Sequence, residues 1–116
     1  MALPNYSIAI KRAQTQEATL ALSAIYQAQI GYSHSHGGNY AESLQDLSIG
    51  VGPFQTFKNL VVANADVVSC QGNREFFLAS LTAKDDSFEL YLLEDGRIVC
   101  APCESSLCEK LGYPLW

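Results

Sequence analysis

Four cysteines are the residues of this chain whose type and spacing could do chemistry: Cys70, Cys100, Cys103 and Cys108. The segment Cys100-Ala101-Pro102-Cys103 has the Cys-x-x-Cys form of dithiol redox sites, in which a helix N-terminus stabilises a thiolate. Such a motif normally follows an early strand and opens a long helix within a βαβ unit. Only a short segment follows Cys103, and no parallel-sheet pattern surrounds it. A small periplasmic thiol-redox protein is therefore an alternative and not the main interpretation.

Metal binding is the second chemistry that these residues could support. A structural zinc site normally uses two close pairs of ligands, and only one such pair, Cys100 and Cys103, is present. His34 and His36 lie in a polar, glycine-bounded loop, where histidines are usually surface residues. The sequence has no His-Glu-x-x-His, Gly-x-Ser-x-Gly or phosphate-cradling motif. We expect no catalytic site, no metal and no cofactor, with a small periplasmic metal-binding protein as an alternative.

Disulfide formation is the chemistry that the cysteines favour. An even number of cysteines in a domain of this size is typical of an oxidising compartment and predicts two disulfides. A Cys100–Cys103 bridge would close a very small ring, which is poor geometry for a structural bond. Two pairings remain open: Cys70–Cys100 with Cys103–Cys108, or Cys70–Cys103 with Cys100–Cys108. We favour the first, because Cys100 ends a predicted strand near the sheet edge where Cys70 should arrive.

A long N-terminal helix, at about residues 4–33, is the element that must position everything else. No glycine interrupts it before Gly31, and apolar residues recur at helical spacing on two rows. The first row predicts burial in the domain and contains Ala18, Ala21, Leu22, Ile25, Ala28 and Tyr32. The second row contains Tyr6, Ile10, Ala13, Leu20 and Ala24. The second row indicates a further contact surface, for neighbouring copies of the chain.

The remainder predicts an antiparallel sheet of three or four strands. A loop is expected at about residues 34–74, with a short helix or turn at residues 40–47 and one or two short strands, 60–62 and 67–68, separated by a turn at residues 64–66. The main strands are expected at residues 75–82, 88–93 and 98–100, the last two joined by an Asp95-Gly96 turn. The residues expected to face the helix are Phe77, Ala79, Leu81 and Ala83. The fold class is α+β, with the sheet at about residues 75–101 and a cysteine-bounded segment at 100–116.

Length and composition limit the possible functions. The 116 residues form one domain, 1–116. Hydrophobic residues make up 48% of the chain and charged residues only 16%, a low surface charge that suits packing against copies of itself. The net charge of −5 argues against a nucleic-acid partner, since phosphate contacts need clustered Lys and Arg. No apolar run reaches the roughly 18 residues of a membrane helix.

Three stretches carry a resemblance to a known family. The first is Ala2-Leu3-Pro4-Asn5-Tyr6, and the second is the helical segment from Glu17 to Gln29. The third is Gly37-Gly38-Asn39-Tyr40-Ala41-Glu42-Ser43-Leu44. Together they resemble the N-terminal region of type IV pilins over about the first 47 residues. Pilins also carry a leader and an apolar segment that are not present before Met1. We therefore expect an engineered start codon on a shortened chain.

The resemblance implies a pilin fold and a structural role without enzymatic activity. It implies one subunit of a helical filament of identical subunits, with pilus assembly machinery and, through the missing segment, the inner membrane as partners. It implies an extracellular bacterial pilus for adhesion or twitching motility, after an inner-membrane and periplasmic stage, and N-terminal methylation. The alternatives within the family are a minor pilin and a type II secretion pseudopilin. The implied filament interface contains Pro4, Tyr6, Ile10, Ala13, Glu17, Leu20 and Ala24, with a helix bend at Pro4 and Lys11 or Arg12 of another copy opposite Glu17.

Thiol counting separates the structural interpretation from the redox and metal alternatives. Protein made in an oxidising compartment and assayed under denaturing, unreduced conditions should contain no free thiols, because two disulfides consume all four cysteines. The same protein after reduction is the control and should contain four. Four thiols before reduction would contradict the disulfide prediction.

Overall fold

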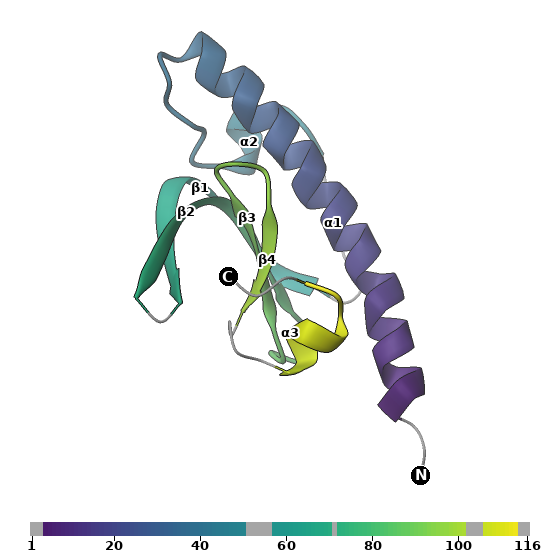
Figure 1. The fold of residues 1–116 in the computed structure, drawn as a ribbon. Coiled ribbons are helices and arrows are strands. Elements are labelled where there is room, and N and C mark those ends of the chain that lie inside the picture. The colour runs from purple at the N-terminus through teal and green to yellow at the C-terminus, as the bar shows by residue number, and fades with distance from the viewer. Residues whose placement is uncertain (1–3, 51–56, 71, 102–105, 114–116) are drawn as a thin grey trace.

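A computed structural model describes residues 4–50, 57–70, 72–101 and 106–113. The elements follow in the order α1 (Pro4–Ser35), α2 (Leu44–Leu47), β1 (Phe57–Cys70), β2 (Asn73–Ala83), β3 (Glu89–Leu93), β4 (Ile98–Ala101) and α3 (Ser106–Lys110). Figure 1 shows α1 lying along the sheet, with its N-terminal turns extending past the strands. The architecture is α+β, as predicted from the sequence.

Helix α1 contains 32 residues, close to the predicted span. It begins at Pro4, where the missing backbone N–H removes no helical hydrogen bond. The predicted bend at Pro4 would involve the preceding turn, which lies outside the described residues. The helix ends where Gly37 and Gly38 adopt positive φ angles of 68° and 90°, and the Gly38 N–H donates to the Ser33 carbonyl at 2.9 Å.

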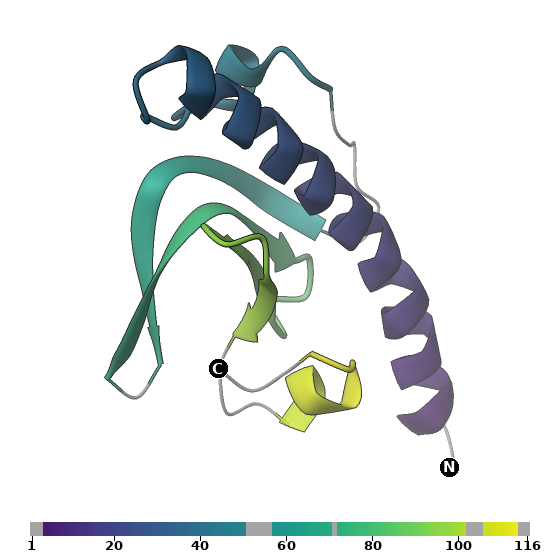
Figure 2. The same cartoon turned by 45° about the horizontal axis from the view of Figure 1, so that its top comes forward.

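The sheet is a four-stranded antiparallel meander with the strand order β1-β2-β3-β4. Strands β2, β3 and β4 match the predicted strands to within about two residues, which is the usual uncertainty of strand ends. The β3–β4 connection contains the predicted Asp95-Gly96 turn, in which the Gly96 N–H donates to the Leu93 carbonyl at 3.0 Å. Figure 2 shows that β1 and β2 curve strongly along their length.

Strand β1 differs from the sequence prediction. It is one strand of 14 residues where two short strands and a turn at residues 64–66 were expected, so it occupies part of the predicted loop at residues 34–74. The chain passes the predicted turn as an irregularity between Val62 and Asp66, where the register with β2 shifts. The irregular backbone is held from outside the sheet, because Tyr40 N–H donates to Asn64 Oδ1 at 3.0 Å.

The β2 strand also contains a bulge that the alternation of its sequence does not reveal. Phe77 pairs with Leu93 and Ala79 pairs with Leu92, so Leu78 is the extra residue. Ala79, Leu81 and Ala83 join the α1-facing core as predicted, and Leu78 joins them. The prediction for Phe77 is wrong, because the bulge reverses the alternation and turns its ring to a second cluster. There it packs edge-on against Tyr91 at 4.9 Å between ring centroids.

The main core lies between α1 and the sheet. Most of the first apolar row of α1 belongs to it: Ala18, Leu22 and Ile25 are fully buried, and Ala28 and Tyr32 pack at its margin. From the sheet it takes Leu81, Leu90 and Leu92, all with 0% exposure. Tyr40, Leu44 and Leu47 from the α2 region also pack on this core, as their helical spacing predicted. Burying these side chains is the main source of stability.

A buried glutamine joins α1 to the loop and to β1. Gln29 is 0% exposed. Its Oε1 accepts from the Ala41 N–H at 2.7 Å, and its Nε2 donates to the Ala41 carbonyl at 3.0 Å and to the Ala63 carbonyl at 3.3 Å. One amide side chain therefore forms hydrogen bonds with backbone groups of the loop after α1 and of the irregular part of β1, where regular secondary-structure hydrogen bonds are missing. We call this set of hydrogen bonds the Gln29 clamp.

Replacing Gln29 by methionine tests the clamp. Met has a similar length but no amide, so Gln29→Met should leave the backbone groups of Ala41 and Ala63 unpaired in the core. We expect the free energy of unfolding, measured in urea, to fall by about 2–4 kcal/mol. Gln27→Met, at an exposed position of the same helix, is the matched control and should change it by less than about 0.5 kcal/mol. Equal effects of the two substitutions would contradict the clamp.

Candidate functional site

Among the described residues, the polar side chains singled out for chemistry are not grouped in one metal-type site. His34 and His36 are exposed, and the His36 ring stacks on Tyr32 with 3.7 Å between ring centroids and 2° between planes. His36 Nδ1 also lies 2.8 Å from the Tyr32 carbonyl oxygen. Within the described parts of the chain, no three His, Cys, Asp or Glu residues are grouped to hold a metal ion. His36 thus closes the C-terminal end of α1.

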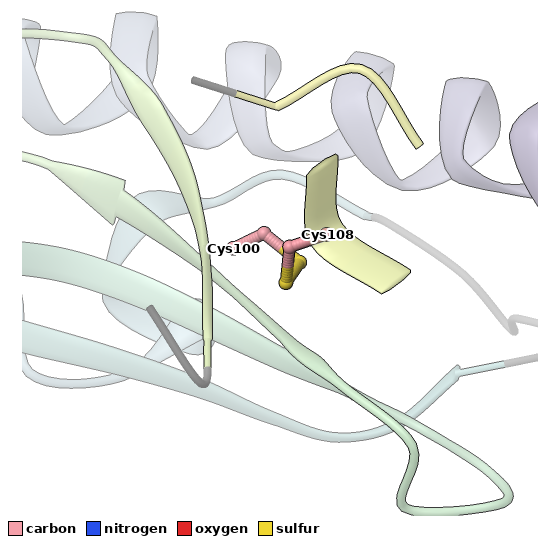
Figure 3. Close-up of a disulfide and its surroundings, with 2 residues drawn as sticks. All are labelled: Cys100 and Cys108. Carbon is pink, nitrogen blue, oxygen red and sulfur yellow. A yellow bond between two sulfur atoms is a disulfide. The ribbon is translucent and has the colours of Figure 1, made fainter. Parts of the chain in front are cut away.

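The described disulfide joins Cys100 to Cys108, whose Cα atoms are 5.6 Å apart (Figure 3). The preferred pairing of Cys70 with Cys100 is therefore wrong. Cys70 ends β1 and Cys100 lies in β4, at opposite edges of the sheet, so three strand spacings of about 4.8 Å separate them. That exceeds the roughly 7 Å limit for bonded cysteines. Cys70 is also disulfide-bonded, and Cys103 lies outside the described residues.

The short helix α3 brings Cys108 to the sheet. Cys100 and Cys108 are 2% and 3% exposed, and Leu111 is buried beside them in the main core. The Leu111 N–H donates to the Leu107 carbonyl at 2.9 Å, continuing the helical turn. The sequence prediction left this segment without regular structure. The spacing of four residues between Leu107 and Leu111 was the available signal for a helix. Leu115 and Trp116, later in the same segment, lie outside the described residues.

The outer side of α1 is the first candidate contact surface. Of the predicted interface residues, Glu17, Leu20 and Ala24 are exposed, and Leu20 is 73% exposed. They follow one another at helical spacings of three and four, so they lie along one line of the helix. We call Glu17, Leu20 and Ala24 the helix strip. For Pro4, Tyr6, Ile10 and Ala13, side-chain environments lie outside the described set.

The β1–β2 hairpin presents a second apolar surface, which the sequence prediction missed. Val67 and Phe76 pair across the two strands and are 40% and 52% exposed. With Arg74 and Glu75 they line a shallow hollow of about 240 Å³. We call Val67, Arg74 and Phe76 the hairpin patch. The available signal was that both alternating sets of residues 75–82 contain large apolar side chains, although one helix can cover only one face.

The charges around the hairpin patch are unequally paired. Arg97 contacts Asp95 at 2.7 Å and Glu75 at 3.5 Å, so Glu75 already has a cationic neighbour. A hydrogen bond from the Arg97 backbone N–H lowers the pKa of Asp95. Asp95 therefore remains ionised at neutral pH, and its stabilising effect is lost only as the pH falls through this lowered pKa. Arg74 makes no ion pair with any described residue, and neither does Glu17 on the helix strip.

The β3–β4 turn fixes the position of the sheet against α1. Gly96 has a φ of +95°, and a Cβ atom at this position would lie 3.1 Å from the Tyr26 ring. Only glycine therefore fits both the backbone conformation and the close contact. Burial and the charge of the neighbouring Glu94 raise the pKa of Tyr40, which belongs to the same group of contacts.

No described helix is both long and apolar enough to cross a membrane. No protein-family model, curated protein or solved structure matches the chain. The functional conclusion therefore depends on the two exposed surfaces and on the resemblance in the sequence.

Substituting Gly96 tests the contact between the turn and α1. Gly96→Ala should lower the free energy of unfolding by about 2–3 kcal/mol, from backbone strain and crowding against Tyr26. Gly112→Ala is the matched control, since Gly112 has a φ of +93° with open space around it. It should cost only about 1–2 kcal/mol. In a Tyr26→Ala background the difference between the two substitutions should disappear, and a difference that persists would contradict the contact.

Proposed function

We propose that this chain is a non-enzymatic structural subunit of a type IV pilin-like filament. The observation that carries the proposal is the division of α1 into two sides. Leu22 and Ile25 are fully buried against the sheet, whereas Leu20 on the other side is 73% exposed. The side of α1 that carries Leu20 is therefore a surface open to contact with other copies of the chain.

Three further features support the proposal. The segments from Pro4 to Tyr6 and from Gly37 to Leu44 resemble those of type IV pilins. A long N-terminal helix on an antiparallel sheet, with a disulfide in the C-terminal segment, is compatible with a pilin fold. Cys100 is paired with Cys108 and not with Cys103, which disfavours a Cys-x-x-Cys redox site.

The proposal includes a location and partners. The subunit would pass through the inner membrane by an N-terminal apolar segment, meet the assembly machinery in the periplasm and end in an extracellular fibre. A minor pilin or a type II secretion pseudopilin would use the same surfaces in a shorter assembly. Fibre length seen by electron microscopy separates these roles.

Leu20→Gln tests the role of the helix strip. In the chain joined to a pilin-type apolar segment and expressed with an assembly system, the variant should give few or no fibres by electron microscopy, because an apolar contact between copies is lost. The isolated chain should keep its free energy of unfolding to within about 0.5 kcal/mol, since Leu20 is exposed.

Leu22→Gln, at a fully buried position two residues along on the opposite side of the helix, is the control for folding. It should lower the free energy of unfolding of the isolated chain by about 3–5 kcal/mol. Normal fibres from Leu20→Gln, or equal destabilisation by both substitutions, would overturn the role given to Leu20.

A further inference from the structure

We propose that the hairpin patch of one copy binds the helix strip of the next copy. Phe76 packs beside Leu20 and Ala24, and Arg74 pairs with Glu17. The inference rests on the proposed filament function and names the surface that covers the helix strip.

Exposure is the first argument. Among the described residues, the exposed large apolar side chains are Leu20 at 73%, Phe76 at 52%, Val61 at 45% and Val67 at 40%. Leu20 and Phe76 do not cover each other within one chain. Their burial therefore requires another molecule, and a second copy of this chain offers one of each surface.

Charge complementarity is the second argument. Arg74 lies on the same strand face as Phe76, because residues two apart in a strand point the same way. Glu17 lies beside Leu20, because residues three apart in a helix are neighbours. Neither Arg74 nor Glu17 has an ion-pair partner among the described residues. The two surfaces thus carry opposite charges that no described residue pairs, in a protein whose net charge of −5 otherwise opposes self-association.

Spacing is the third argument. Arg74 and Phe76 are separated by about 6.6 Å along the strand. From the midpoint between Leu20 and Ala24, Glu17 lies five helical residues away, about 7.5 Å. A ring seated at this midpoint therefore brings Arg74 level with Glu17 when β2 runs in the same direction as the partner's α1. The small Ala24 side chain leaves room for the ring next to Leu20.

The two surfaces are different, which determines the kind of assembly. When the contact is made once in each pair, every pair keeps one free surface of each kind, so the contact can repeat from copy to copy. This contact is small, and small interfaces are weak. In isolation it should show at high protein concentration only, and in a filament it would add to contacts between helices.

The test uses the full 116-residue chain in sedimentation equilibrium at concentrations up to about 1 mM. The wild type should associate progressively, with an average mass that rises past that of a dimer. Leu20→Gln removes one surface and Phe76→Thr the other, the latter with a residue that still favours a strand. Each variant alone should associate at least about tenfold more weakly.

An equimolar mixture of the two variants distinguishes this contact from any other. The Leu20→Gln chain still offers Phe76, and the Phe76→Thr chain still offers Leu20, so the mixture should form dimers and nothing larger. A wild type that stays monomeric, single variants that associate like the wild type, or a mixture as weak as its components would each overturn the proposal.

Charge reversal tests the register of the contact. Glu17→Arg and Arg74→Glu should each weaken association, and the chain carrying both should recover wild-type association because the pair is restored in reverse. Failure to recover would contradict the Arg74–Glu17 pair. Fibres unaffected by Phe76→Thr would overturn this contact and leave the filament function intact. Chains that associate in solution but form no fibres would overturn the filament function and leave this contact intact.

Discussion

The Gln29 clamp is the interaction on which the arrangement of the elements depends. Helix α1 buries its apolar row on the sheet, which determines the side that faces the sheet, but apolar contact is not directional and does not fix the path of the following loop. The Gln29 amide adds that information, because it accepts from Ala41 N–H and donates to the carbonyls of Ala41 and Ala63. Each of those backbone groups would be costly to bury without a partner. The clamp thus ties the buried side of α1 to the loop and to β1, and it acts together with the apolar row.

The other end of the sheet is fixed by covalent and steric means. The Cys100–Cys108 disulfide holds α3 against β4, and Thr19 Oγ1 lies 3.4 Å from Tyr113 Oη, linking α1 to the segment after α3. Between these points Gly96 lies directly under the Tyr26 ring. Helix α1 is therefore tied to the loop, the β3–β4 turn and the C-terminal segment. The β1–β2 hairpin bends away from this region (Figure 2), which leaves Val67 and Phe76 exposed.

The periodicity of apolar residues predicted the regular helix and strands, and it failed where the backbone becomes irregular. The extent of α1 and the strands β2 to β4 followed from helical spacing, alternation and the Asp95-Gly96 turn. The sequence did not reveal the bulge at Leu78, because a bulge leaves composition unchanged while it reverses every side chain beyond it. The continuity of β1 through Asn64 also could not be predicted, since it depends on hydrogen bonds from Gln29 and Tyr40, which are distant in sequence. The disulfide was assigned wrongly for the same reason, because strand order is a tertiary property.

The same limit explains why one candidate surface was predicted and the other was not. The helix strip is a local pattern on one helix, so Glu17, Leu20 and Ala24 could be placed together by counting residues. The hairpin patch exists because Val67 and Phe76 become neighbours only when β1 pairs with β2, and because the hairpin leaves the region that α1 covers. Two unlike apolar surfaces can be buried by reciprocal contacts in a closed twofold pair or by contacts that repeat from copy to copy. The contact proposed here is of the second kind, in which successive copies would bury both surfaces, and a filament would provide that arrangement.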